Sequence, residues 1–221
     1  MPSVRPILLI SFAACFAVLG GPHWAGAESI AAGSGAVSAP VRTVEKLHTA
    51  LLAVMKDAEK LGYQGRYERL APVLQETYDT PFMAEKSVGR HWKQASPTDQ
   101  AELVATFSRF MISNYAGRFD GYSGQAFQIV SEEPSAQGSV LVRTRLTQPQ
   151  EEGVQLDYRL RETGGSWKII DVYLNGTVSE LALRRSEYVS LIKRDGWQGL
   201  ISALDDRIAS LASAPANHNL N

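Results

Sequence analysis

The sequence predicts an α+β fold in which helices cover one face of a four-stranded antiparallel sheet. The first observation is a run of four strand-like segments between Gln125 and Leu174, in which apolar and polar residues alternate. The second is the helical periodicity of apolar residues on both sides of this run. Because one face of the sheet is apolar, it needs a cover, and the flanking helices are expected to supply it.

The start of the chain has the pattern of a secretory signal peptide over residues 1–27. Arg5 precedes an apolar run from Ile7 to Leu19, and small residues at Ala25 and Ala27 suit cleavage after Ala27. The weaker alternative is a lipoprotein whose Cys15 becomes lipidated. Since Cys15 is the only cysteine, cleavage after Ala27 would leave a mature chain without disulfides or cysteine-bound metals.

The remaining chain divides into three parts. Residues 28–40 are rich in Ala, Gly and Ser and are expected to form a flexible leader. Residues 41–212 are long enough for one domain, and residues 213–221 show no pattern and are expected to be a disordered tail. The net charge of −1 argues against nucleic-acid binding, which requires a clear basic surplus.

Helical segments come first in the domain. One is expected from Val41 to near Gly62, and a second from Arg66 to Thr77. Thr80 is expected to cap a short third helix with Pro81 in its first turn. These segments supply part of the cover for the sheet.

The strongest helix start in the chain is at Ser96, and the helix that follows is expected to reach Arg118. Its apolar stripe is wide and aromatic. The stripe consists of Leu103, Phe107, Phe110, Met111 and Tyr115. After the sheet, Ser179 is expected to cap a helix through Ile192, and a last helix follows a break at Gly196.

The four strands are expected at residues 127–130, 140–146, 155–161 and 167–174. A two-residue turn at Gly164 and Gly165 would place Leu160 opposite Ile169 and Tyr158 opposite Asp171. The outer face would carry a ladder of basic residues, either a solvated face with cross-strand pairs or a docking surface for an acidic partner. These residues are Arg143, Arg145, Arg159, Arg161 and Lys168.

Few residues point to chemistry. The spacing of His48, His91 and His218 matches no metal-ligand motif, and no cofactor fingerprint is present, so neither a metal nor a cofactor is expected. Asp171 would share a face with apolar residues, which would raise its pKa as in a general acid or base. The favoured interpretation is structural, with hydrogen bonds that hold the sheet together. A small secreted hydrolase or isomerase using Asp171 is the alternative.

Several motifs together resemble the periplasmic lipid carriers of the MlaC, or toluene-tolerance, family, and most closely their hopanoid-associated HpnM branch. Order and spacing carry this resemblance over about residues 41–211. The motifs lie at residues 80–84, 89–92, 96–110, 115–119, 167–172 and 176–188. Tyr78-Asp79 stands where the family usually has Phe-Asp.

The resemblance implies helices closed over a twisted four-stranded sheet, with an apolar cavity between the layers that holds lipid tails. It implies a soluble, non-enzymatic, monomeric periplasmic carrier of hopanoid or phospholipid, in transient contact with membrane complexes, working between an inner-membrane lipid transporter and the outer membrane. The same side chains could instead form a solid core. The candidate lipid-binding residues are Phe82, Trp92, Phe107, Phe110, Met111, Tyr115, Val140, Val142, Leu156, Tyr158, Leu160 and Ile169.

Overall fold

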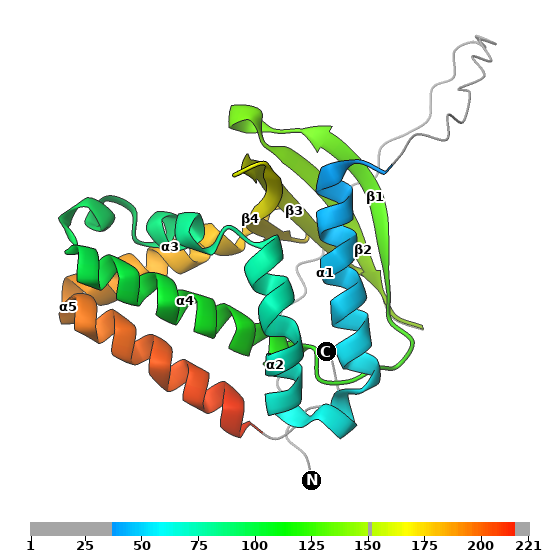
Figure 1. Cartoon of the computed structure of the whole chain (residues 1–221), viewed down its shortest axis with the longest axis horizontal. Coiled ribbons are helices and arrows are strands. Elements are labelled where there is room, and N and C mark those ends of the chain that lie inside the picture. Colours follow the sequence, from blue (N-terminus) through cyan, green and yellow to red (C-terminus); the bar gives the residue numbers. More distant parts are fainter. Residues whose placement is uncertain (1–36, 150–151, 215–221) are drawn as a thin grey trace, which may run out of the picture. The chain divides into compact units, whose positions relative to one another are not determined.

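The computed structural model describes residues 37–149 and 152–214, so the expected signal peptide, most of the leader and most of the tail lie outside the described residues. The predicted α+β class is confirmed. The sheet has five strands rather than four, in the order β1-β2-β3-β4-β5, with every neighbouring pair antiparallel (Figure 1). The strands are β1 (Ala126–Pro134), β2 (Val140–Thr147), β3 (Val154–Thr163), β4 (Ser166–Leu174) and β5 (Val178–Ser179).

The extra strand β5 is only two residues long and was not expected from the sequence. Asn175 and Gly176 adopt positive φ angles of 51° and 71°, which fold the chain back so that Val178 pairs with Leu174. Ser179 then caps the following helix through a bond from the Ala182 N–H, as predicted. The turn at Asn175 and Gly176 and the helix cap at Ser179 are so close in sequence that β5 can be only two residues long.

Five α-helices surround this sheet. α1 contacts β1, β2 and β4 and lies across their inner face, whereas α4 packs mainly on α2, α3 and α5 (Figure 1). The helices are α1 (Ala39–Lys56), α2 (Ala58–Thr77), α3 (Thr80–Val88), α4 (Pro97–Arg118) and α5 (Glu180–Ser213), with short 3-10 turns at Gly89–Gln94 and Ala136–Gly138. The cover of the sheet is thus built from α1, which contacts three strands, and from α5, which contacts β4 and β5 and carries α4 packed against it.

Helix boundaries follow the local capping chemistry. The Ser96 hydroxyl accepts from the Asp99 N–H while the Asp99 carboxylate accepts from the Ser96 N–H, so the predicted start of α4 is a capping box. The predicted Thr80 cap is wrong: the carboxylate of Asp79 accepts from the Phe82 N–H and caps α3 instead. Gly196 breaks α5 at the expected place, with a φ of 72°.

The first helix ends earlier than expected. α1 stops at Lys56, where the backbone of Asp57 closes the helix, and α2 begins at Ala58. Gly62, with a φ of 59°, is a break inside α2 rather than the end of α1. Gly62 therefore interrupts the helical backbone as predicted, but α1 has already ended at Lys56, before the glycine.

A β-bulge changes the predicted register of β3 and β4. Leu160 lies opposite Ile169 as expected, but Ile170 is an extra residue, so Asp171 pairs with Arg159 and Tyr158 pairs with Val172. The predicted Tyr158–Asp171 pair is therefore wrong. Because one inserted residue exchanges the two faces of a strand, Val172 and Leu174 point to the inner face.

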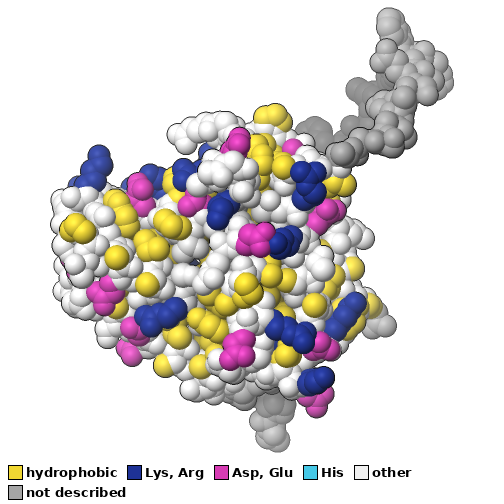
Figure 2. Space-filling view, in the orientation of Figure 1, with side chains coloured by type: hydrophobic (Ala, Val, Ile, Leu, Met, Phe, Trp, Pro, Cys, Tyr) yellow, Lys and Arg dark blue, Asp and Glu magenta, His cyan; other side chains and the backbone are white. Residues whose placement is uncertain are grey.

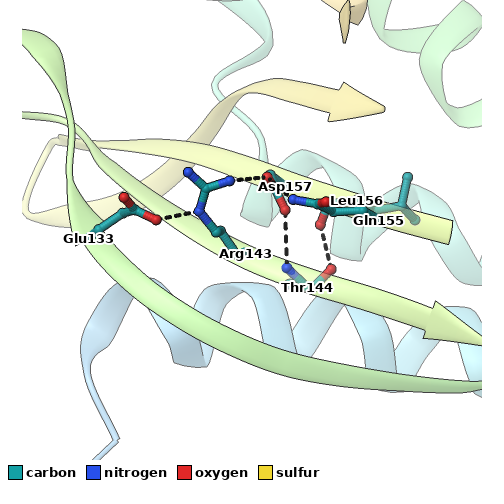
Figure 3. Close-up of polar contacts among 6 residues, drawn as sticks. All are labelled: Glu133, Arg143, Thr144, Gln155, Leu156 and Asp157. Carbon is teal, nitrogen blue, oxygen red and sulfur yellow. Dashed lines mark hydrogen bonds and ion pairs between the residues drawn. The ribbon is translucent and has the colours of Figure 1, made fainter. Parts of the chain in front are cut away.

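The outer face of the sheet contains a buried carboxylate, Asp157, which is 0% exposed. It accepts bonds from the Arg143 guanidinium at 3.0 Å, the Gln155 amide at 2.7 Å and the Thr144 N–H at 3.3 Å (Figure 3). The regular pairing of β2 with β3 is interrupted at Arg143 and Thr144, and resumes in the same register at Arg145. The Asp157 carboxylate therefore bonds Arg143 and Thr144 of β2 at the point where the backbone pairing between β2 and β3 is interrupted.

The basic ladder on this face is largely engaged within the protein. Arg143 also pairs with Glu133, Arg161 with Asp79, and Arg159 with the Ser139 hydroxyl. On the opposite, helix-bearing side of the molecule, which Figure 2 shows, basic and acidic side chains are interspersed rather than gathered by sign. Cross-strand ion pairs, as expected, form at Arg143 with Glu133 on β1 and Asp157 on β3, whereas Arg161 pairs with Asp79 outside the sheet.

We expect Asp157→Ala to lower the free energy of unfolding by about 2–3 kcal/mol, because it leaves the buried Thr144 N–H and the half-buried Gln155 amide without an acceptor. Asp157→Asn keeps one acceptor and should lose less. Arg145→Ala, at an exposed position on the same face, should change stability by no more than about 0.5 kcal/mol. Urea unfolding measures all three, and an Asp157→Ala chain as stable as the wild type would show that Asp157 does not hold the strands together.

Candidate functional site

A pocket of about 560 Å³ lies between α4, the first turns of α5 and the inner face of the sheet. Most of its lining is apolar, with four charged side chains among the rest. The lining residues are Tyr78, Met83, Phe107, Phe110, Met111, Asn114, Tyr115, Gly117, Arg118, Phe119, Asp120, Leu146, Val154, Leu156, Tyr158, Val172, Leu174, Glu180, Leu181, Arg184 and Ala214. Its volume falls within the range of roughly 300–1,000 Å³ that is usual for ligand pockets.

The inner face of the sheet has a packed end and an open end. At the packed end, near the β3–β4 hairpin, Leu160 and its partner Ile169 are fully buried and do not line the pocket. At the open end, Leu156 and its partner Leu174 do line it. The backbone link between Tyr78 and Ile169 closes the packed end, since the Asp79 N–H donates to the Ile169 carbonyl at 2.9 Å.

The helical wall of the pocket is aromatic. On α4, Phe107, Phe110 and Tyr115 recur at helical spacing on one face, and Phe119 follows directly after the helix. The rings of Tyr115 and Phe119 stack with centroids 5.6 Å apart. The wall therefore consists of rigid side chains that are already packed against one another.

The hydroxyl groups of the three tyrosines in the walls each have a partner. The hydroxyls of Tyr78 and Tyr115 share a hydrogen bond, and Tyr158 lies 3.2 Å from the Nε2 atom of His48. Burial raises the pKa of Tyr115 to about 12 and raises that of Tyr78 and Tyr158 well above the usual value. Burial also lowers the pKa of His48 to about 3, so all four rings are neutral near pH 7.

Charged residues at the pocket come from two helix ends. Arg118 lies in the last turn of α4, and Asp120 follows that helix, whereas Glu180 and Arg184 lie in the first turns of α5. The Arg184 guanidinium lies over the Phe110 ring, 4.9 Å from its centroid. Charge is thus present where the end of α4 meets the start of α5.

Asp79 attaches the helices to the sheet beside the pocket. Its carboxylate accepts from the Phe82 N–H at the start of α3 and from both Arg161 and Thr163 on β3. Burial opposes ionisation of Asp79, but the bonds from Arg161 and Thr163 outweigh it and lower the pKa of the carboxyl. The preceding residue, Tyr78, lines the pocket.

Asp171 forms a second attachment, between β4 and α5. Its carboxylate accepts from the Ser179 hydroxyl at 2.6 Å, the Leu181 N–H at 3.1 Å and the Val172 N–H at 2.8 Å. Burial raises its pKa, and these three bonds only partly oppose the shift. Asp171 does not line the pocket, so its arrangement is that of a structural residue.

The twelve candidate residues separate into two groups. Six line the pocket: Phe107, Phe110, Met111, Tyr115, Leu156 and Tyr158. Six lie elsewhere: Val140, Val142, Leu160 and Ile169 pack in the core at and beside the closed end of the sheet, the Phe82 ring packs under Arg161, and Trp92 packs at the edge of the core. Whether a bound ligand contacts any of the twelve stays a prediction.

Sequence reasoning missed several residues of the lining. The predicted register contains no bulge and would turn Val172 and Leu174 away from the inner face, because the bulge at Ile170 leaves no mark in the pattern. Arg118 and Arg184 are far apart in sequence, and only the fold brings them to one pocket. Leu146 alternates in step with Val140 and Val142 on its strand, so alternation alone could have found it.

His48 is buried, and its ring stacks on that of Phe127 with ring centroids 4.0 Å apart. Within residues 37–149 and 152–214, no group of three or more His, Cys, Asp or Glu side chains is placed to hold a metal ion. Over the same residues, no helix combines the length and apolar character needed to cross a membrane.

A helix-covered antiparallel sheet with an apolar pocket between its layers defines a small-molecule binding protein of the α+β class. The chain belongs to the MlaC protein family, whose model matches residues 45–206. A similar solved structure is the phospholipid-binding protein from Ralstonia solanacearum in complex with a phospholipid. The two chains share 26% identity with a TM-score of 0.69, over 80% of this chain and 100% of that one. No curated protein sequence matches the chain.

We expect the buried His48 to make the protein less stable in mild acid. Its pKa is about 3 when folded but ordinary when unfolded, so below about pH 6.5 the unfolded state binds more protons and the free energy of unfolding falls as pH falls. The loss approaches about 1.4 kcal/mol per pH unit from this group. His48→Gln should remove that loss, whereas His91→Gln should retain it. Equal pH profiles for wild type and His48→Gln would contradict the assignment.

Proposed function

We propose that this protein is a lipid-binding carrier that holds lipid tails in the pocket between α4 and the sheet. The observation that carries the proposal is the mostly apolar pocket of about 560 Å³, whose tyrosine hydroxyls are already hydrogen-bonded within the protein. Such a wall offers burial of apolar surface and few directional contacts. Tails suit it better than a polar metabolite, which would need hydrogen bonds along the whole wall, where apolar side chains offer none and the tyrosine hydroxyls are already bonded.

Burial alone supplies enough free energy to hold a lipid. At about 0.8 kcal/mol per methylene, burying about fifteen methylenes yields on the order of 12 kcal/mol before the cost of ordering the chain. Transfer from a membrane is closer to balanced, because the tail is already in an apolar medium there. A carrier needs this balance, since its ligand must leave as readily as it enters.

Membership of the MlaC family and the likeness to a phospholipid-binding protein support this proposal. We further propose that the chain is a periplasmic monomer that receives or delivers its lipid at an inner-membrane transporter and exchanges it with the outer membrane. Hopanoid is the cargo implied by resemblance to the HpnM branch, and phospholipid is the ligand bound by the Ralstonia solanacearum protein. Both fit an apolar pocket.

The protein is proposed to act without catalysis. Both carboxylate oxygens of Asp171 are engaged by donors on β4, β5 and α5, and the side chain lies outside the pocket lining. A general acid or base must reach the ligand directly or through one water. The arrangement therefore favours a structural role for Asp171 over the hydrolase or isomerase alternative.

The direct experiment is to express the chain from Glu28 in a bacterial periplasm, purify it without detergent and record native mass spectra, followed by lipid extraction. We expect a stoichiometric adduct that extraction identifies as a phospholipid or a hopanoid. A ligand-free mass that stays unchanged after incubation with lipid vesicles would refute the carrier function.

A pocket-filling substitution should displace the tail. Leu156→Trp adds a bulky ring at the open end of the sheet, and displacing about two methylenes costs about 1.6 kcal/mol, or more than about tenfold in affinity. Val130→Trp is the matched control, because Val130 is 63% exposed and lies outside the pocket lining. Lipid extracted per chain is the readout, and equal loading of the two folded variants would show that the lipid lies elsewhere.

A further inference from the structure

The second half of α5, after the break at Gly196, runs beside α4 and reaches the pocket (Figure 1). Near its start, the Gln198 amide donates to the Glu102 carboxylate at 3.2 Å, and near its end Leu211 packs on Gly117. Both Gly117 and Ala214, which directly follows α5, line the pocket. The end of α5 therefore forms part of the pocket wall where α4 ends.

Gly117 allows the two helices to approach closely at this point. A Cβ atom added to Gly117 would lie 3.2 Å from the Cδ2 atom of Leu211 and 3.9 Å from its Cβ atom. Glycine inside a helix is less favourable than alanine, because it loses more conformational freedom on folding. The contact gives a reason for glycine in the last turn of α4, since Leu211 occupies the space that a side chain would need.

The end of α5 is held less firmly than the rest of its second half. Leu200 and Leu204 are fully buried. None of residues 205–214 is buried, and among them only Ile208 and Leu211 pack partly against the core. A segment with few buried apolar contacts is among the first to open locally. Residues 207–214 are called the terminal flap below.

The ion pair of the terminal flap also adds little resistance to opening. Arg207 hydrogen-bonds Glu187 on the first half of α5, and the two side chains are 39% and 35% exposed. Ion pairs in contact with solvent contribute little to stability, because water solvates both groups when they separate. The terminal flap can therefore lift from α4 while Leu200 and Leu204 keep the preceding turns of the helix in place.

We propose that the terminal flap is a lid on the pocket, which lifts from Gly117 to admit or release the ligand and closes when Leu211 returns to its contact. This inference rests on the proposed carrier function and concerns the regulation of the same site. A lid that closes equally well with and without ligand changes the rates of entry and exit but not the affinity. The terminal flap thus controls how fast a ligand is exchanged.

A disulfide tests whether the terminal flap must move. The Cβ separation of 3.9 Å between positions 117 and 211 lies within the range of roughly 3.5–4.5 Å that disulfides require. Cys15 is the only cysteine in the sequence, so Gly117→Cys with Leu211→Cys introduces the only thiols into a chain that begins at Glu28. Oxidation should lock the terminal flap onto α4, and reduction with dithiothreitol should release it.

Uptake of a pyrene-labelled phospholipid from phosphatidylglycerol vesicles measures the rate of exchange. We expect the oxidised double variant to take up the probe about tenfold more slowly than the reduced form of the same protein, because the locked pocket opens only by wider local unfolding. Both forms should reach the same final loading. Each single cysteine variant is a control, and its rate should respond to neither oxidant nor reductant.

Leu211→Ala is a second test, which needs no disulfide. It weakens the closed position of the terminal flap and should raise the exchange rate by about fivefold. Leu183→Ala is the matched control, because Leu183 lies on the first half of α5, is 53% exposed and lies outside the pocket lining. Its exchange rate should equal that of the wild type.

The outcomes separate the lid from the carrier function. Equal rates for the oxidised and reduced double variant, or an unchanged rate in folded Leu211→Ala, would overturn the lid while the carrier function stands. Cysteines that do not oxidise would also overturn the lid, because Leu211 would then not lie on Gly117. A wild type that takes up no probe would contradict the carriage of phospholipid and overturn the lid with it.

Discussion

Two buried carboxylates, Asp79 and Asp171, hold the helices to the sheet around a space that side chains do not fill. Asp79 joins the start of α3 to Arg161 and Thr163 on β3, and Asp171 joins β4 to the start of α5. Each attachment is adjacent to a residue of the pocket lining, Tyr78 in one case and Leu181 in the other. An apolar cavity tends to collapse because its lining lacks contacts, so its walls must be held by something other than the cavity. Here directional hydrogen bonds to ionisable groups serve that purpose.

The need to hold the pocket walls in place also explains why the sheet has a packed end and an open end. α1 and the Tyr78–Ile169 link close the inner face near the β3–β4 hairpin, where Leu160 and Ile169 are fully buried. α4 packs mainly on other helices, so its aromatic face is left for the pocket rather than for the strands. One domain therefore contains both a solid core that provides stability and a space available to a ligand. The loss of stability caused by the unfilled space is confined to the open end of the sheet.

The fold was readable from the sequence because its signals are local. Strand alternation, the capping box at Ser96 and the break at Gly196 each depend on residues a few positions apart, and all three are present. The pocket lining was only half readable, because it depends on long-range features. A single bulge at Ile170 changes which residues of β4 point to the inner face, and no residue type in that strand predicts the bulge. Apolar periodicity marks Leu160 and Leu156 alike, although one is solid core and the other lines the pocket.

The edges of the sheet have a further consequence, for behaviour at high concentration. An unpaired edge strand can recruit the edge of another molecule and begin aggregation. β1, at one edge, contains a bulge between Ile129 and Ser131 and ends in Glu132-Glu133-Pro134, while β5 at the other edge is only two residues long. An irregular, charged, proline-ended strand and a very short one are both poor templates for a partner strand. The molecule can thus display a sheet to solvent and accumulate without forming intermolecular sheets.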